Sequence, residues 1–209
     1  MRDERRLYTA YFAAYMFIAI GIYLLRQRPN QPLQPWVLAA SAASAFAPAY
    51  VFAVMVNRYL WRVVLIRKLL GITTPCVHGR WVGYIKSSYS SYATEHRVTI
   101  EFWQTLRDLH VWYYDDNAIT SSLVAGFSPS NEGGPTRLYC VYHNQPFRTT
   151  DPNLQSHNGV MEMIVEPSGR RIIGIYYNNP HQRKTYGEMR LEREGKRLLG
   201  RLESPEGSK

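Results

Sequence analysis

The chain has 209 residues, enough for one medium-sized domain with an additional segment. Charged residues make up 20% of it and aromatic residues 13%, which excludes a disordered tail or a collagen-like repeat. Two cysteines are too few for a disulfide framework. The net charge of +9 is uneven, because residues 1–71 carry nine basic and two acidic groups, whereas residues 72–209 carry 16 and 14. The basic excess flanks apolar segments, which is typical of a membrane anchor and not of a DNA- or RNA-binding face.

Two long runs within residues 1–71 contain no charged side chain: residues 7–25 and residues 36–56. As helices they would extend about 28 Å and about 31 Å, close to the hydrocarbon thickness of a bilayer. Pro32 and Pro35 mark a tight turn between them. The pattern predicts a transmembrane helical hairpin with two spans.

Two alternatives to the hairpin are a secretory signal peptide for the first run and a buried, alanine-rich core helix for the second. Arg26 and Arg28 follow the first run where a cleavage site would lie, which disfavours the signal peptide. Seven Arg and Lys residues flank the outer ends of the hairpin and only these two arginines lie in its turn, so both chain termini are expected in the cytoplasm.

Small residues recur in the second run at four-residue spacing, which favours close helix packing in lipid. They form two ridges, Ala39, Ala43 and Ala47, and Ala45, Ala49 and Ala53. Residues 57–70 are apolar and basic. They are expected either to continue the second helix into the headgroup layer or to form a helix packed on the soluble domain.

From residue 72 to residue 193 the hydrophobic period changes to two, which predicts strands. Eight are expected, over residues 79–86, 97–104, 110–114, 118–127, 137–144, 159–166, 171–178 and 185–193. Because hairpin-length turns join them with no helix between, we expect an all-β domain that is an eight-stranded antiparallel minimal β-barrel, lipocalin-like, in preference to a sandwich. Residues 194–209 are a basic, polar tail.

The sequence contains no phosphate-binding loop, paired-histidine spacing, Gly-x-Ser-x-Gly or Cys-x-x-Cys motif. We therefore expect no enzyme, no metal and no cofactor. Aromatic and basic residues on the strands favour a barrel that stacks bases and neutralises phosphates, although small barrels also fill themselves with aromatic side chains. A ligand-binding barrel and a filled one both remain open.

Several short motifs follow the hairpin in a fixed order. They are Gly79-Arg-Trp81-Val-Gly83, the strand Leu138-Tyr-Cys-Val-Tyr-His-Asn-Gln-Pro146, His157-Asn158-Gly159 and Arg183-Lys-Thr185-Tyr-Gly187. Together they resemble the two-transmembrane β-barrel effectors of cyclic-oligonucleotide antiphage signalling (CBASS), over nearly the whole chain.

The resemblance implies a cytoplasmic barrel that binds a cyclic dinucleotide made by a partner nucleotidyltransferase after phage infection. It also implies a homo-oligomer that disrupts the bacterial inner membrane and kills the cell, with no DNA or RNA partner. The implied ligand contacts are Tyr139, Tyr142, Asn144, Tyr176, Arg183 and Thr185, with Gln104 and Ser121 second. The tyrosines would stack on bases, the two amides would bind base edges, and Arg183 and Thr185 would contact phosphate. Alternatives are a membrane-anchored, lipocalin-like carrier of a small apolar ligand and a structural assembly protein with a filled barrel.

Overall fold

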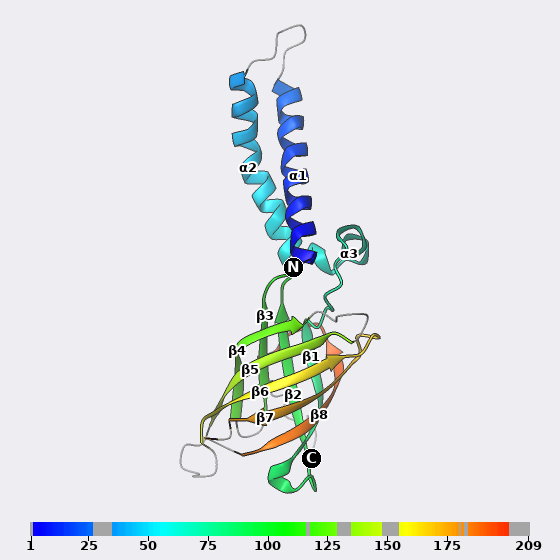
Figure 1. The fold of residues 1–209 in the computed structure, drawn as a ribbon, viewed down its shortest axis with the longest axis vertical. Helices are drawn as coiled ribbons and strands as arrows, with labels where there is room; N and C mark the ends of the chain where they lie inside the picture. The colour runs from blue at the N-terminus through cyan, green and yellow to red at the C-terminus, as the bar shows by residue number, and fades with distance from the viewer. Residues whose placement is uncertain are drawn as a thin grey trace, which may run out of the picture. The chain divides into compact units, whose positions relative to one another are not determined.

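The computed structural model describes residues 2–26, 35–115, 118–128, 135–147, 155–179, 181 and 184–200. The expected turn between the two apolar runs, most of the tail and Arg183 lie outside these residues. The chain divides into two compact units, with the boundary between Thr73 and Thr74. The first unit is helical and the second is a β-barrel (Figure 1).

The helical unit is built on two long helices, α1 (Arg2–Arg26) and α2 (Pro35–Arg58). Both are long and apolar enough to cross a membrane by length and composition. Only 6% of the most apolar window of α1 and 17% of that of α2 is buried, which is unlike a core helix. The hydroxyl of Tyr15 donates to the Ala42 carbonyl across the pair, at 3.0 Å.

The two alanine ridges of α2 differ in exposure. Ala45 is fully buried, while Ala49 and Ala53 are partly buried. Because α1 is the helix packed along α2, this ridge faces α1. The three residues of the other ridge are exposed, namely Ala39, Ala43 and Ala47.

The continuous helix that was one expectation for residues 57–70 is not observed. A short 3₁₀ helix, η1 (Leu60–Arg62), and a separate helix, α3 (Val64–Leu70), follow α2, and Val63 between them is extended. The guanidinium carbons of Arg62 and Arg67 lie 5.9 Å and 5.6 Å from the Trp61 ring centroid. In one straight helix the side chains of residues 61 and 67 would point about 120° apart, so the chain has to bend to bring both arginines to one ring.

The second unit is a closed antiparallel barrel in which each strand pairs with the next and β8 pairs with β1. The strands are β1 (Gly79–Ser87), β2 (Glu95–Gln104), β3 (Leu109–Tyr114), β4 (Ala118–Ser128), β5 (Arg137–Pro146), β6 (His157–Val165), β7 (Arg171–Asn178) and β8 (Tyr186–Gly195). All eight expected strands are present, and the expected closed barrel is confirmed. Closure pairs both edges of every strand within the chain.

Side chains fill the end of the barrel where β1 begins. Trp81 is fully buried and packs edge-to-face on Phe102, with ring centroids 6.1 Å apart. Its Nε1 donates to the Val77 carbonyl at 2.8 Å, and the Arg193 guanidinium lies 4.8 Å from its ring centroid. This half of the lumen is therefore a packed core.

Gln104 fastens the segment that enters the barrel to the same closed end. Its Oε1 accepts from the backbone nitrogens of Val77 and His78, at 2.8 Å and 3.2 Å, and its Nε2 donates to the Pro75 carbonyl at 2.9 Å. One buried amide thus satisfies three backbone groups that no strand pairs.

The segment after β8 covers part of the outer surface of β1 and β2. Glu101, which points outward but is 1% exposed, accepts from the backbone nitrogens of Leu199 (2.8 Å) and Gly200 (3.0 Å) and from Arg80 Nη1 (2.9 Å). The buried carboxylate is therefore fully supplied with donors, as burial of a charge requires.

Candidate ligand site in the barrel lumen

The end of the barrel opposite Trp81 contains a hollow of about 430 Å³, within the usual range for small-ligand sites. We call it the lumen pocket. Its wall comes from the ends of β1, β3, β5 and β7 and the beginnings of β2, β4 and β6, with Thr185 just before β8. The lining residues used below are Tyr89, His96, Arg97, Tyr113, Thr120, Tyr142, Asn144, His157, Met161, Tyr176, Asn178 and Thr185.

Two tyrosines of the lumen pocket each lie on a glycine of the neighbouring strand. Tyr142 pairs with Gly159, and a Cβ built on that glycine would lie 2.4 Å from the Tyr142 ring carbon Cζ. Tyr176 pairs with Gly187, where a Cβ would lie 2.6 Å from the ring carbon Cε1. The missing side chains let both rings lie against the barrel wall, which leaves the space in front of them open.

A chain of hydrogen bonds holds the Tyr142 ring in place. Its hydroxyl donates to Asn178 Oδ1 at 2.6 Å, and Asn178 Nδ2 donates to the Thr185 hydroxyl. On the same strand as Tyr142, β5, Asn144 Nδ2 donates to the hydroxyl of Thr120 on β4 at 2.8 Å. Hydroxyl and amide groups retain further donor and acceptor capacity in such chains, so they can also bind the polar edge of a ligand.

Burial and charge also shape the pocket wall. Burial raises the pKa of Tyr113 well above its ordinary value, with the nearby Asp115 carboxylate as the second cause. Tyr113 therefore remains a neutral hydrogen-bonding phenol at physiological pH. At the rim Arg97 lies among the acidic Glu95 and Asp115, so the pocket wall carries charges of both signs.

The structure brings four of the eight expected contact residues together in the lumen pocket, namely Tyr142, Asn144, Tyr176 and Thr185. Arg183 lies outside the described residues. Gln104 lies at the closed end, where it holds the entering segment.

Tyr139 and Ser121 lie on the outer surface of the barrel. Side chains alternate between the faces of a strand, so Tyr139, three residues before Tyr142, must point the other way, and it is 39% exposed. Ser121 pairs with the outward-facing Trp112, and its neighbour Thr120 points into the lumen.

Several wall residues were not among the expected contacts. They are Tyr89, His96, Arg97, Tyr113, Thr120, His157, Met161 and Asn178. The two-residue period of a strand could have predicted Thr120 and Asn178 as wall residues, because each lies two residues from an inward-facing residue of the same strand. The rim residues depend on how strand ends are staggered around the barrel, which no local pattern specifies.

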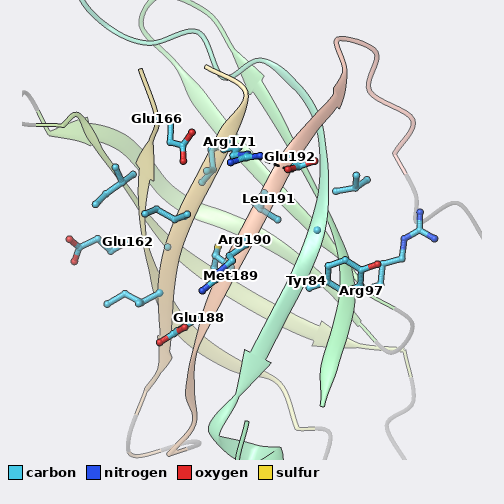
Figure 2. A pocket seen from close by; sticks show the side chains of 17 residues that line it. Tyr84, Arg97, Glu162, Glu166, Arg171, Glu188, Met189, Arg190, Leu191 and Glu192 are labelled. Atoms are coloured by element: carbon cyan, nitrogen blue, oxygen red, sulfur yellow. Dashed lines mark ion pairs between the residues drawn. The ribbon is translucent and has the colours of Figure 1, made fainter. Parts of the chain in front are cut away.

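A second hollow, of about 890 Å³, lies over β6, β7, β8 and β1, as Figure 2 shows. Most of its lining side chains point outward. Arg171 Nε on β7 contacts Glu192 Oε1 on the neighbouring strand β8 at 3.2 Å. It is larger than the lumen pocket but is a surface depression, without the paired rings and amide groups found inside the barrel. We therefore assign the candidate ligand site to the lumen pocket.

Comparison with protein families matches residues 72–193 to the family described as Cap15, cyclic dinucleotide receptor domain. The chain belongs to the Cap15 family. The matched residues contain the whole wall of the lumen pocket. The resemblance to CBASS effectors is confirmed, and membership of the Cap15 receptor family supports a CBASS effector that binds cyclic dinucleotides. No curated protein matches the chain.

Proposed function

We propose that the chain is a membrane-anchored antiphage effector whose lumen pocket binds a cyclic dinucleotide supplied by a partner nucleotidyltransferase. Ligand binding drives assembly of the anchored copies, and the assembled helices disrupt the bacterial inner membrane. The observation that carries the proposal is a pair of tyrosine rings lying against the wall of the lumen pocket, beside amide and hydroxyl groups, inside a domain of the Cap15 receptor family.

The chemistry of the lumen pocket suits both parts of such a ligand. The faces of Tyr142 and Tyr176 offer stacking surfaces for two bases, and stacking contributes about 1–3 kcal/mol per base. Asn144 and Asn178 present amide groups to base edges, while Thr185 is placed to contact a phosphate with the neighbouring Arg183. The packed closed end below them limits the ligand to the open half of the lumen.

The polar wall also separates this proposal from the carrier of an apolar ligand. A dry carrier cavity is expected to be lined by aliphatic side chains. The lumen pocket instead contains two asparagines, two threonines and two histidines among the residues that line it. A hydrocarbon chain would exclude water from these polar groups and offer no hydrogen bond to their remaining donors and acceptors, which opposes its burial there.

The anchor provides the physical basis for the assembly step. Copies held in one membrane meet at a far higher effective concentration than free copies do. The exposed ridge of Ala39, Ala43 and Ala47 on α2 permits close approach of a helix from another copy. A ligand that binds the assembled state better shifts the population towards it.

Thermal unfolding of the full chain in detergent micelles tests ligand binding. The additives are cyclic dinucleotides with two purines, with two pyrimidines and with one of each, their linear counterparts, and fatty acids. A cyclic dinucleotide present at a hundred times its Kd stabilises the folded chain by about 2.7 kcal/mol. Stabilisation by fatty acids alone would support the carrier instead.

Replacing Arg183 by alanine tests the phosphate contact. We expect the Arg183→Ala chain to lose binding of the stabilising dinucleotide, because it loses the positive charge proposed to contact phosphate. The barrel should stay folded, because position 183 lies outside the eight strands. Circular dichroism of the same samples checks the fold. An unchanged Kd would remove Arg183 from the site.

A further inference from the structure

The loop between β1 and β2 presents a tyrosine ring at the open end of the lumen pocket. The loop begins with the short 3₁₀ helix η2 (Ser88–Ser90), and Tyr89 in the middle of this helix lines the pocket. Tyr89 is nevertheless 65% exposed, whereas Tyr142 is buried and Tyr176 is partly buried. Burying such a ring against a bound ligand is favourable, because apolar surface then leaves water.

The backbone that follows η2 adopts a conformation that its residues rarely take. Ser91 has a φ of 48° and Tyr92 a φ of 61°, both in the left-handed region. For a bulky residue such as tyrosine, a positive φ is a genuine outlier that costs free energy. Glycine adopts this conformation without a steric cost, but residues 88–94 contain no glycine. The surrounding contacts must therefore hold the loop in this shape.

Hydrogen bonds within the loop and to β8 supply these contacts. The Tyr92 nitrogen donates to the Ser87 carbonyl at 3.0 Å, and the Ser91 nitrogen donates to the Ser88 carbonyl at 3.1 Å. The Ser88 hydroxyl accepts from the nitrogen of Tyr186, the first residue of β8, at 3.1 Å. The rings of Tyr92 and Tyr186 also meet edge to face, with centroids 6.3 Å apart. The strained loop is thus fastened to the beginning of β8.

We propose that Tyr89 is a third aromatic contact of the cyclic dinucleotide, and that the strained loop fixes its ring at the open end of the pocket before the ligand arrives. The inference rests on the proposed function and adds a binding residue to the same site. Tyr142 and Tyr176 lie against the barrel wall, so they can cover only the side of a ligand that faces the wall. Tyr89 lies at the open end and can cover a side that faces solvent.

Backbone strain in a loop at the edge of a binding pocket has a physical use. A side chain that is already fixed in its bound position loses little conformational entropy when the ligand binds, so more of the contact energy appears as affinity. A role of the Tyr89 ring in packing of the barrel is disfavoured, because most of the residue meets solvent. The hydrogen bonds that fasten the loop to itself and to β8 are made by other residues, so they remain when the ring is removed.

Isothermal titration of the full chain in micelles tests the contact, with the cyclic dinucleotide of the panel that most raises the unfolding temperature. The variant is Tyr89→Ala. The matched control is Tyr84→Ala, a tyrosine of β1 that is 53% exposed and points outward, because its neighbour Ile85 lines the lumen. We expect the Kd to rise about tenfold in Tyr89→Ala, because one stacking surface is lost, and to stay unchanged in Tyr84→Ala. Tyr89→Phe keeps the ring and should bind as the unmodified chain does.

Substitutions of Ser91 test whether the loop conformation positions the ring. Ser91 is not among the residues that line the pocket. Glycine adopts a positive φ freely, so Ser91→Gly should leave the Kd unchanged. A β-branched side chain is strongly disfavoured there, so Ser91→Val should displace the loop and raise the Kd about tenfold, as Tyr89→Ala does. Thermal unfolding without ligand checks that the barrel of each variant is folded.

The outcomes separate this inference from the proposed function. An unchanged Kd in Tyr89→Ala would overturn the contact and leave the proposed function standing. Equal Kd values for Ser91→Val and Ser91→Gly would overturn the positioning role of the loop. If no cyclic dinucleotide of the panel stabilises the unmodified chain, the proposed function fails, and the assignment of Tyr89 fails with it.

Discussion

Gly159 and Gly187 leave room for the Tyr142 and Tyr176 rings in the wall of the lumen pocket. Substituting Gly159 tests this role most directly. An alanine Cβ there would lie 2.4 Å from the Tyr142 ring and 2.8 Å from the Tyr177 backbone oxygen, so both the ring and the neighbouring strand must shift. We expect Gly159→Ala to weaken cyclic dinucleotide binding at least about tenfold, equivalent to about 1.4 kcal/mol. Isothermal titration of the full chain measures the effect. Gly126→Ala, with no atom within 4 Å of the added carbon, is the control and should bind as the unmodified chain does.

The buried thiol of Cys140 makes the stability of the barrel depend on alkaline pH. Burial raises the pKa of Cys140 from 9.0 to about 12. The folded state therefore keeps a proton that the unfolded chain loses above pH 9, and stability that is complete below pH 9 falls as pH rises towards 12. For one group the slope is about 1.4 kcal/mol per pH unit.

Urea unfolding of the full chain between pH 8.5 and pH 10 measures this slope. The Cys140→Ala chain keeps every other titrating group and is the matched control. We expect the free energy of unfolding to fall less steeply with pH in Cys140→Ala than in the unmodified chain. Parallel pH profiles would show that the thiol is not protected by the fold.

Residue-level prediction from the sequence succeeded where a residue type and its strand parity agreed. Tyr142, Asn144 and Tyr176 all face the lumen, whereas Tyr139 faces outward although it is the same residue type on the same strand as Tyr142. Choosing both tyrosines of β5 conflicts with the two-residue period of a strand. The position of the Tyr142 ring against the barrel wall could not be predicted, because it depends on the strand register that places Gly159 beside Tyr142.

At the scale of elements, we expect substitutions in the exposed and the buried alanine ridge of α2 to have different effects. The exposed ridge is available to another copy, so replacing Ala43 and Ala47 by leucine should block killing of the cell and leave dinucleotide binding unchanged. Growth after induction of expression measures killing, and binding is measured on purified chain. Unaltered killing by the double variant would count against helix packing as the effector step.

The buried ridge supplies the control for this experiment. Ala45 is fully buried against the rest of the hairpin, so Ala45→Leu should disturb the hairpin itself. We expect lower amounts of Ala45→Leu in the membrane, in contrast to normal amounts of the Ala43→Leu, Ala47→Leu chain. Immunoblotting of membrane fractions distinguishes loss of protein from loss of activity.

The sequence pattern predicted the elements of this chain well, because each one is bounded by strong local signals. The eight strands lie within a few residues of their expected positions, and α2 extends the expected run of residues 36–56 by one residue at its start and two at its end. The break after α2 escaped prediction. It follows from the packing of Arg62 and Arg67 on Trp61, a tertiary contact that local periodicity does not encode.

At the scale of the whole molecule, the barrel is closed at one end and open at the other, and this asymmetry locates the site. The sequence predicted a closed barrel but not which end admits a ligand. That outcome is decided by side chains far apart along the chain, since Gln104 and Arg193 both meet the segment that precedes β1. Only the assembled register brings them together.

Trp81 is the centre of the closed end, and its removal should unfold the barrel without unfolding the hairpin. Trp81→Ala deletes a fully buried ring together with its contacts to Phe102 and Arg193, which costs about 3–5 kcal/mol. Hydrogen exchange of the full chain in micelles measures both units at once. We expect fast exchange throughout β1 to β8 and unchanged protection of α1 and α2, because the two units are separately compact. An equal loss of protection in the helices would show that the hairpin depends on the barrel for its own stability, and Trp81→Phe, which keeps an aromatic core, should restore most of the protection in the strands.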